Sequence, residues 1–287
     1  MICIYHNKDL DGFCSGAIMR LKWPDATFIG ADYGDKLDIP ANEDVMMADF
    51  SLPMNDMLEL GRMSTSFVWV DHHKSAIEEF YRCEAADRDY VITPVLDASI
   101  SACEGVWRHL FGWQPLPAAV RLLGEYDTWR GFGSDAWNDI TLPFQYGMRL
   151  RCNSLDTFPG RFLFADSLSK LIGNTITTGQ ICLDYQRQQN RILCRRAFVA
   201  EIMGYKAICL NMPDVSSLTF ESVYDPAVHD LMIGFTVGTS HCGYSLRSDK
   251  IDCSEIARAF GGGGHKGAAG FAIEGTDPMV VLKIEKK

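Results

Sequence analysis

Acidic and imidazole side chains follow three short apolar runs in the first quarter of the sequence. The runs are residues 2–5, 45–48 and 67–70, and the side chains behind them are those of His6, Asp9, Asp11, Asp49, Asp71, His72 and His73. Clustered carboxylates repel one another unless a cation lies between them. A mixed set of carboxylates and imidazoles suits Mn²⁺, Mg²⁺, Fe²⁺ or Zn²⁺. The set is too large for one tetrahedral ion, so it indicates two metals about 3.5–4 Å apart that share a carboxylate.

The apolar runs themselves predict how these side chains are positioned. Each run is short and does not alternate with polar residues, which is typical of strands buried on both faces of a parallel sheet. Helices are expected between the runs, at Phe13 to Leu21 and Met54 to Met63, so residues 1–130 are predicted to form an α/β sheet. Ligands bind beyond the carboxyl ends of such strands, where the acids and histidines would converge.

Each of these signals also has a plainer interpretation. Asp9 and Asp11 could be turn residues before Gly12, and Asp49 could be a helix N-cap. The same chemistry at three strand ends nevertheless favours a site, because clustered titratable groups mark functional sites.

A second stretch with chemical potential lies near the C-terminus. Gly261, Gly262, Gly263 and Gly264 are followed by His265 and Lys266. Glycine backbone N–H groups can approach an anion closely, and Lys266 adds positive charge. The alternative is a glycine turn with a purely structural role.

Length and composition limit the number of domains and the possible classes of protein. A chain of 287 residues predicts two domains. The net charge is −10, with 27 Lys and Arg against 37 Asp and Glu, which argues against a protein that wraps duplex DNA. The sequence contains no apolar run of the roughly 20 residues that span a bilayer, and its start does not resemble a signal peptide. We therefore expect no membrane association, and the cysteines, whose spacing suits neither a zinc site nor a disulfide framework, favour the reducing cytoplasm as the location.

The rest of the chain is less specific. Residues 131–160 are expected to be rich in loops, residues 162–197 to form two helices, and the residues from 198 onward to be rich in strands, with a helix from Ser254 to Phe260 that ends at Gly261. The ten cysteines contain no C-x-x-C pair and are expected to be free, buried thiols. Ser101 and Glu104 fit a capping box. The aromatic residues Trp107, Phe111, Trp113 and Trp129 are expected in the core rather than on a base-stacking platform.

The N-terminal motifs resemble those of the DHH phosphoesterase superfamily. The matching stretches are His6-Asn7-Lys8-Asp9-Leu10-Asp11-Gly12, Asp49-Phe50-Ser51, Asp71-His72-His73 and Glu125-Tyr126-Asp127. The resemblance implies two ions, Mn²⁺ in the first place: one held by His6, Asp9 and Asp49, the other by Asp11, Asp49, His72 and Asp127. It also implies that His73 faces the substrate phosphate. This sequence departs from many members in one respect: they have a proline and one more residue between the histidine and the aspartate that correspond to His6 and Asp9.

The C-terminal stretch resembles the GGGH-x-x-AAG signature of the DHHA1 domain. Arg247 and Ser248 match the strand of that domain that carries a substrate-binding arginine. The resemblance thus implies that Arg247, Ser248, Gly262, Gly263, Gly264, His265 and Lys266 bind substrate. Arginine suits bidentate phosphate binding.

Together these observations predict an α/β protein with three parts. These are a parallel-sheet DHH domain at 1–155, a helical connector at 156–196 and a smaller α/β DHHA1 domain at 197–287, with the active-site cleft between the two domains. The predicted activity is two-metal hydrolysis of a phosphodiester in short oligonucleotides or dinucleotides, with Asp49 and His73 as catalytic residues. The alternatives are cleavage of phosphoanhydrides, as in polyphosphate or pyrophosphate, and a nucleotide-binding sensor without activity. A homodimer is left open.

Overall fold

The computed structural model of the protein describes residues 1–84, 91–164, 169–213 and 215–284. Its internal contacts divide the chain into two compact units, Met1–Leu183 and Asp184–Lys287. Each unit is described by itself below.

The N-terminal unit is built on a five-stranded parallel sheet with the strand order β2-β1-β3-β4-β5. The strands are β1 (Ile2–His6), β2 (Thr27–Ala31), β3 (Asp44–Ala48), β4 (Ser66–Asp71) and β5 (Thr93–Leu96). The predicted α/β class with a parallel sheet is therefore confirmed. Strand β5 was not predicted from the sequence because it contains Pro94, which a sheet tolerates at an edge such as this one.

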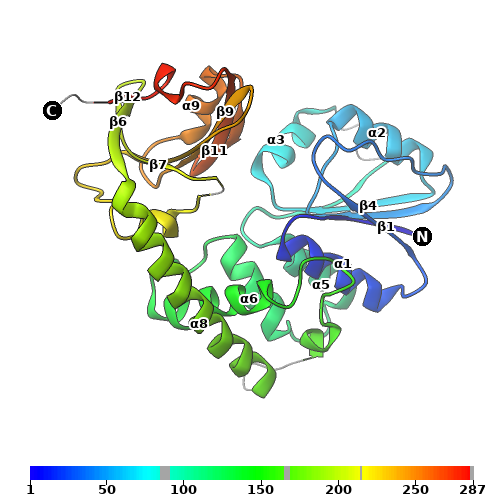
Figure 1. Ribbon diagram of the computed structural model, residues 1–287. Coiled ribbons are helices and arrows are strands. Elements are labelled where there is room, and N and C mark those ends of the chain that lie inside the picture. The colour runs from blue at the N-terminus through cyan, green and yellow to red at the C-terminus, as the bar shows by residue number, and fades with distance from the viewer. Residues whose placement is uncertain (85–90, 165–168, 214, 285–287) are drawn as a thin grey trace. The chain divides into compact units, whose positions relative to one another are not determined.

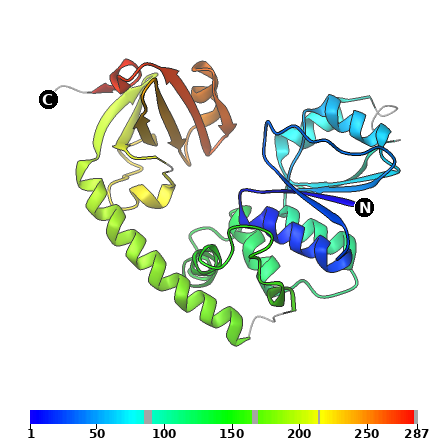
Figure 2. The same cartoon turned by 45° about the vertical axis from the view of Figure 1, so that its right-hand side comes forward.

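Helices cover both faces of this sheet (Figures 1 and 2). One layer contains α2 (Met54–Met63) and α3 (Lys74–Arg82), and the other contains α1 (Leu10–Lys22), α5 (Ala102–Phe111) and α6 (Ala118–Asp127). Alternate residues of each strand feed the two cores: in β1, Ile2 and Ile4 pack in one core while Cys3 and Tyr5 pack in the other. Burial on both faces explains why the strand sequences do not alternate.

Helix α1 begins three residues earlier than predicted. The carboxylate of Asp9 accepts a hydrogen bond of 2.9 Å from the backbone N–H of Gly12 and caps the helix, so Asp11 lies in its first turn. A side chain at position 12 would place its Cβ 2.0 Å from the carbonyl oxygen of His6. Glycine is therefore required where strand β1 turns tightly into the helix.

The region after α6 contains more helix than was expected. Residues 131–160 include a π-helical turn, η1 (Trp137–Thr141), and α7 (Leu142–Arg149), in which Pro143 lies in the first turn where helices tolerate it. The two helices expected in 162–197 are one long helix, α8 (Lys170–Leu193), between the 3₁₀ turns η2 (Gly160–Phe164) and η3 (Cys194–Arg196).

The C-terminal unit is a mixed seven-stranded sheet with the order β10-β11-β9-β8-β7-β6-β12. The strands are β6 (Phe198–Ile202), β7 (Tyr205–Asn211), β8 (Leu231–Val237), β9 (His241–Arg247), β10 (Gly263–His265), β11 (Ala268–Glu274) and β12 (Lys283–Ile284). Helix α9 (Cys253–Ala259) packs on this sheet, and the 3₁₀ turns η4 (Ser217–Phe220) and η5 (Pro278–Val280) lie in its connections. As predicted, Gly261 follows the helix end, with a φ of 78° that favours glycine.

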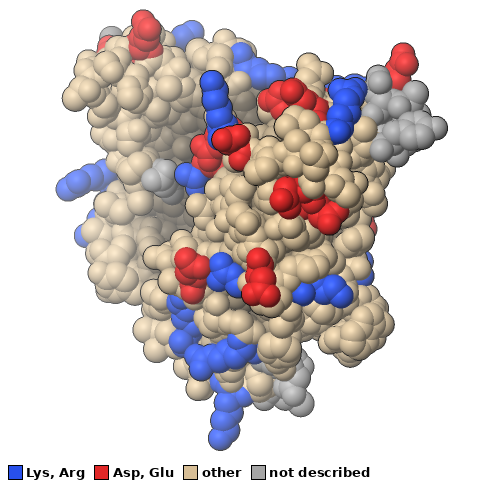
Figure 3. Space-filling model, turned by 90° about the vertical axis from the view of Figure 1, so that its right-hand side faces the viewer, with Lys and Arg blue, Asp and Glu red and all other residues tan. Residues whose placement is uncertain are grey.

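Three further features concern the surface charge, the cysteines and the helices. On the face in Figure 3, acidic and basic side chains are mixed over much of the surface, and several basic side chains gather at the lower left of the view. All ten cysteines are free thiols, and eight of them are buried. Within the described ranges, no helix combines the length and apolar character that crossing a membrane requires.

Candidate metal centre

The carboxyl ends of strands β1, β3 and β4 bring the predicted acids and histidines together. His6 is the last residue of β1, Asp49 directly follows β3, and Asp71 is the last residue of β4. Asp127 lies at the end of a helix rather than of a strand, as the last residue of α6. Three groups of side chains in this region have ligand atoms within 4.8 Å of one another; the groups are His6, Asp9 and Asp49; Asp11, His72 and Asp127; and Asp49, Asp71, His72 and His73.

The first group is centred on the imidazole of His6. Its Nδ1 lies 3.3 Å from Oδ2 of Asp9 and 3.7 Å from Oδ2 of Asp49. The other carboxylate oxygen of Asp9 caps helix α1. The helix cap therefore fixes the direction in which Asp9 presents an oxygen to His6.

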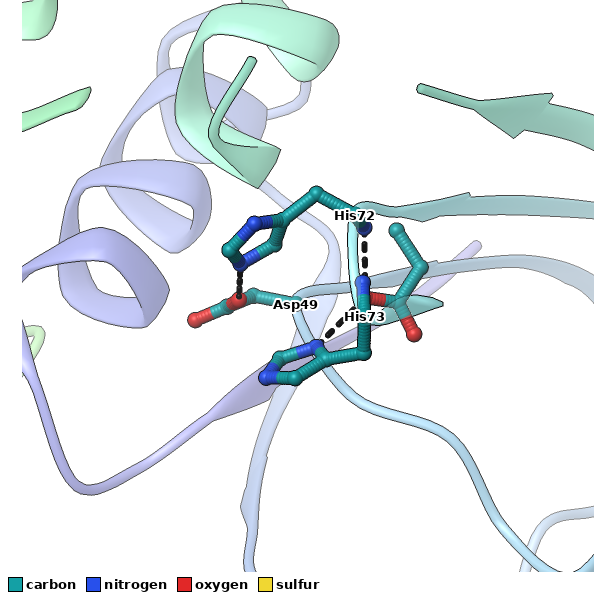
Figure 4. A group of neighbouring side chains, drawn as sticks. Asp49, His72 and His73 are labelled. Atoms are coloured by element: carbon teal, nitrogen blue, oxygen red, sulfur yellow. Dashed lines mark hydrogen bonds and ion pairs between the residues drawn. The ribbon is translucent and has the colours of Figure 1, made fainter. Parts of the chain in front are cut away.

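The second group is centred on the imidazole of His72. Its Nε2 lies 3.2 Å from Oδ2 of Asp127, 3.7 Å from Oδ2 of Asp11 and 3.2 Å from Oδ1 of Asp49. Figure 4 shows the His72 ring pointing at Asp49. Asp49 thus offers one oxygen to each group, which is the position that a bridging ligand occupies.

Helix α5 holds the carboxylate of Asp11 in place. The backbone N–H groups of Ala102 and Cys103 each donate a hydrogen bond of 2.9 Å to its two oxygens. These are among the unpaired donors of the first turn of α5, where the helix dipole also favours a negative charge. Ser101 and Glu104 form the expected capping box of the same helix.

Asp71 positions the histidine that was predicted to face the substrate. One of its oxygens accepts hydrogen bonds from the backbone N–H groups of His72 and His73, and it lies 2.7 Å from Nδ1 of His73. Since Asp71 is 2% exposed, this buried carboxylate fixes the orientation of the His73 ring.

The cluster contains buried polar atoms that no described residue satisfies. They are Nδ1 of His6, Oδ2 of Asp49 and Oδ2 of Asp71. Buried polar atoms are normally hydrogen-bonded, so such exceptions require an explanation. A divalent cation would supply one, because these atoms are the nitrogen and oxygen donors that such ions take.

The electrostatics of the cluster also indicate that a positive charge fits there. Burial and the nearby carboxylates of Asp11 and Asp9 raise the pKa of Asp49 well above its ordinary value, and burial and Asp11 do the same to the pKa of Asp127. Burial opposes ionisation of His6, but the carboxylates of Asp49 and Asp9 outweigh it and raise the pKa of His6 to about 10.

Asp9 shows the opposite shift from Asp49. Its burial disfavours the charged form, but the nearby imidazole of His6 and the hydrogen bond from the N–H of Gly12 prevail and hold the pKa of Asp9 below its ordinary value. The backbone of Asp49 is unusual as well, with a φ of 59°. Non-glycine residues in this region are uncommon and concentrate at functional sites.

Asp32 is a neighbour of the cluster that the sequence interpretation missed. Its Oδ1 lies 3.6 Å from Nε2 of His6, and its Oδ2 lies 2.9 Å from Nζ of Lys8. Asp32 directly follows strand β2, so the strand-end rule that selected Asp49 could have selected it too.

The glycine run of the C-terminal unit has a structural explanation for several of its members. The N–H groups of Gly261 and Gly262 donate to the carbonyls of Arg258 and Ala257 at the end of α9, so these two donors are already used. A Cβ at position 262 would lie 2.2 Å from the carbonyl oxygen of Gly270, and one at position 264 would lie 2.6 Å from Cα of Ala269. At Gly263, by contrast, a Cβ would meet open space.

The remaining predicted substrate-binding residues surround this run. Arg247 ends strand β9, is paired in register with Ala268 of β11, and is partly buried. The hydroxyl of Ser248 donates to the carbonyl of Asp230 and accepts from the N–H groups of Lys250 and Ile251. Ser248 therefore shapes the loop after Arg247, and its hydroxyl has no donor left for a substrate.

Lys266 and His265 complete that set. Lys266 is exposed, and its carbonyl accepts the N–H of Cys253. The backbone of His265 lies in strand β10, while its side chain is outside the described part of the structure.

Sequence comparisons find one domain family and one relative. The DHHA1 domain family matches residues 227–283. An uncharacterized protein of Acanthamoeba polyphaga mimivirus is 26% identical over 280 residues, which are 94% of this chain and 58% of that protein, so the chain spans less than two thirds of the relative's length.

Two solved structures share the fold along nearly the whole chain. The pGpG-specific phosphodiesterase PggH of Vibrio cholerae has a TM-score of 0.54 at 12% identity, over 95% of this chain and 93% of its own. An exopolyphosphatase-related protein of Bacteroides fragilis has a TM-score of 0.56 at 16% identity, over 96% of this chain and 87% of its own. Residues 227–283 thus match the DHHA1 domain family, the chain shares its fold with these two proteins, and its parallel-sheet unit carries an Asp/His cluster suited to divalent metals.

Proposed function

We propose that the protein is a two-metal-dependent phosphodiesterase that hydrolyses short oligonucleotides or dinucleotides. The observation that carries this proposal is the position of Asp49. Its Oδ2 faces Nδ1 of His6 and its Oδ1 faces Nε2 of His72, so one buried carboxylate joins the two ligand groups. A shared carboxylate is the usual device for holding two ions side by side.

The proposed ligand sets follow from these groups. His6, Asp9 and Asp49 would hold one ion, and Asp11, Asp49, His72 and Asp127 the other. Mn²⁺ is our first expectation because the set mixes carboxylates with imidazoles. The bound ions would neutralise charge on the phosphoryl oxygens and lower the pKa of the attacking water.

The chain's own residues would position the substrate and move a proton. The contact between Asp71 and Nδ1 of His73 orients the ring, so the proton that His73 exchanges is the one on Nε2. His73 would donate that proton to the leaving oxygen or to a phosphoryl oxygen. Arg247 would bind a second phosphate, and the loop at Gly263 and Lys266 would supply further donors.

Two other functions are alternatives to this proposal. Hydrolysis of a phosphoanhydride needs the same ions, and one fold neighbour is described as exopolyphosphatase-related. A sensor without activity is disfavoured because all six expected ligands are present and lie together.

The test is a side-by-side assay of the purified chain on a pApA dinucleotide, a short RNA and polyphosphate, with Mn²⁺, with Mg²⁺ and with a chelator. We expect metal-dependent cleavage of the dinucleotide and the short RNA. Cleavage of polyphosphate alone would replace the proposal with the phosphoanhydride alternative. Metal binding without turnover of any substrate would favour the sensor.

A further inference from the structure

The part of the N-terminal unit that follows helix α6 exposes a set of aromatic rings a few residues after Asp127, a member of the metal cluster. Trp129 and Phe132 are 54% and 61% exposed. They lie two and five residues after Asp127, the residue whose carboxylate faces His72. Two peptide steps place Cα of Trp129 no more than about 7.6 Å from Cα of Asp127.

The rings form an ordered stack whose last member is open. Trp137 is buried, and Tyr126 stacks on it at 5.6 Å with an interplanar angle of 10°. Trp129 stacks on Trp137 as well, at 6.0 Å and 21°, while Phe132 packs edge-on against Trp137. The exposed Trp129 thus continues the stack toward solvent.

The backbone holds Trp129 in this position at a cost. Its φ is 57°, which is a true outlier for a bulky side chain. Such strain persists only where the surrounding structure imposes it, and it concentrates at functional sites. Here the hydroxyl of Thr128 donates to the carbonyl of Gly124, and the N–H of Arg130 donates to the carbonyl of Glu125.

We infer that Trp129, supported by Phe132 and Trp137, is a stacking shelf for a nucleobase of the substrate. The inference rests on the proposed function, since it assumes that a phosphate of the same substrate lies at the metal cluster. A flat aromatic base would extend the existing ring stack, and one ribose joins such a base to its phosphate. A polyphosphate has no flat apolar face and would gain nothing from these rings. Base–aromatic stacking is worth about 1–3 kcal/mol and tolerates any base.

The test compares ligands that differ only in the base. Binding of AMP and of ribose 5-phosphate is measured by calorimetry for the wild-type chain and for Trp129→Ala, Trp129→Phe and Trp113→Ala. Trp113 is the matched control, because it is 81% exposed and lies in the connection between α5 and α6. Trp129→Phe keeps a ring at the strained position and guards against a folding defect.

We expect Trp129→Ala to weaken AMP binding about tenfold and to leave ribose 5-phosphate binding unchanged, with Trp129→Phe recovering most of the loss. The control Trp113→Ala should bind both ligands as the wild type does. Equal losses for the two ligands, or wild-type binding of AMP no tighter than of ribose 5-phosphate, would overturn the shelf. Failure of the proposed function has a different signature: a wild-type chain that prefers AMP but cleaves no dinucleotide.

Discussion

The Asp/His cluster and the glycine loop differ in how far each satisfies its own polar groups. In the cluster, Nδ1 of His6 and Oδ2 of Asp49 are buried, and no described residue forms a hydrogen bond with them. In the loop, the N–H groups of Gly261 and Gly262 already donate to the end of helix α9. The cluster therefore has buried polar atoms that a bound ion could satisfy, while Gly261 and Gly262 of the loop already have a structural role.

The two motifs therefore differ in how strongly each indicates a bound ligand. Glycine at 262 and 264 is explained by the close approach of β11, so the run by itself is weak evidence for a ligand. The charged group that we propose the C-terminal unit offers to a phosphate is Arg247, on which burial acts to lower the pKa. Single substitutions in the Asp/His cluster and in the C-terminal unit therefore test this difference.

The largest effect is expected from Asp49→Asn. Removing the shared carboxylate should reduce metal-dependent hydrolysis by a factor on the order of 10³ or more, since several kcal/mol of charge stabilisation are lost. The fold should survive, because asparagine tolerates a positive φ and the loss of one carboxylate relieves repulsion. Steady-state kinetics and the metal-induced rise in Tm measure the two effects, with the exposed Asp25→Asn as control. Full turnover by Asp49→Asn would refute the two-metal arrangement.

The next effect is expected from Arg247→Ala. A charged hydrogen bond to phosphate is worth about 1.5–3 kcal/mol, so KM should rise roughly 10- to 100-fold with little change in kcat. Arg247→Lys should recover part of the loss, because it keeps the charge but not the bidentate geometry. Arg195 is exposed, and Arg195→Ala provides the matched control. An unchanged KM would remove Arg247 from the site.

Metal affinity should depend on pH in a direction set by the cluster. The raised pKa values of Asp49, Asp127 and His6 mean that the metal-free protein retains protons that a metal must displace. Affinity should therefore rise with pH, by about tenfold per pH unit for each proton released. Calorimetry of Mn²⁺ binding in buffers of different ionisation enthalpy counts these protons. Binding without proton release would contradict the assignment of the ligands.

The smallest effect separates two adjacent glycines in the loop. Gly262→Ala should lower the free energy of unfolding of the C-terminal unit by about 1–3 kcal/mol, because the new Cβ would overlap the carbonyl of Gly270. Gly263→Ala should change stability little, since a Cβ there meets open space. Thermal unfolding of the full chain measures both. Equal destabilisation by the two variants would show that the packing explanation is wrong.

The sequence was most informative where one physical rule covers several residues. The carboxyl ends of parallel strands share one edge of a sheet, so residues as distant in the chain as His6 and His72 could be grouped from their positions after apolar runs. Asp32 follows the same rule and was still overlooked.

Other parts of the site depend on contacts that no local pattern encodes. The donors that hold Asp11 come from Ala102 and Cys103, more than 90 residues away. Trp113 and Trp129 were expected in the core, yet both are exposed, because hydrophobicity alone does not distinguish a core ring from a surface ring. Helix α7 was missed because Pro143 and nearby glycines are typical of loops.

The contact between helix α5 and Asp11 bears on how the N-terminal unit folds. The two N–H groups at the start of α5 act as a counter-charge that belongs to the chain itself. They lessen the repulsion among the acids before any ion is bound. Without a bound ion, folding of the N-terminal unit therefore meets less repulsion than the same acids would cause in the absence of α5.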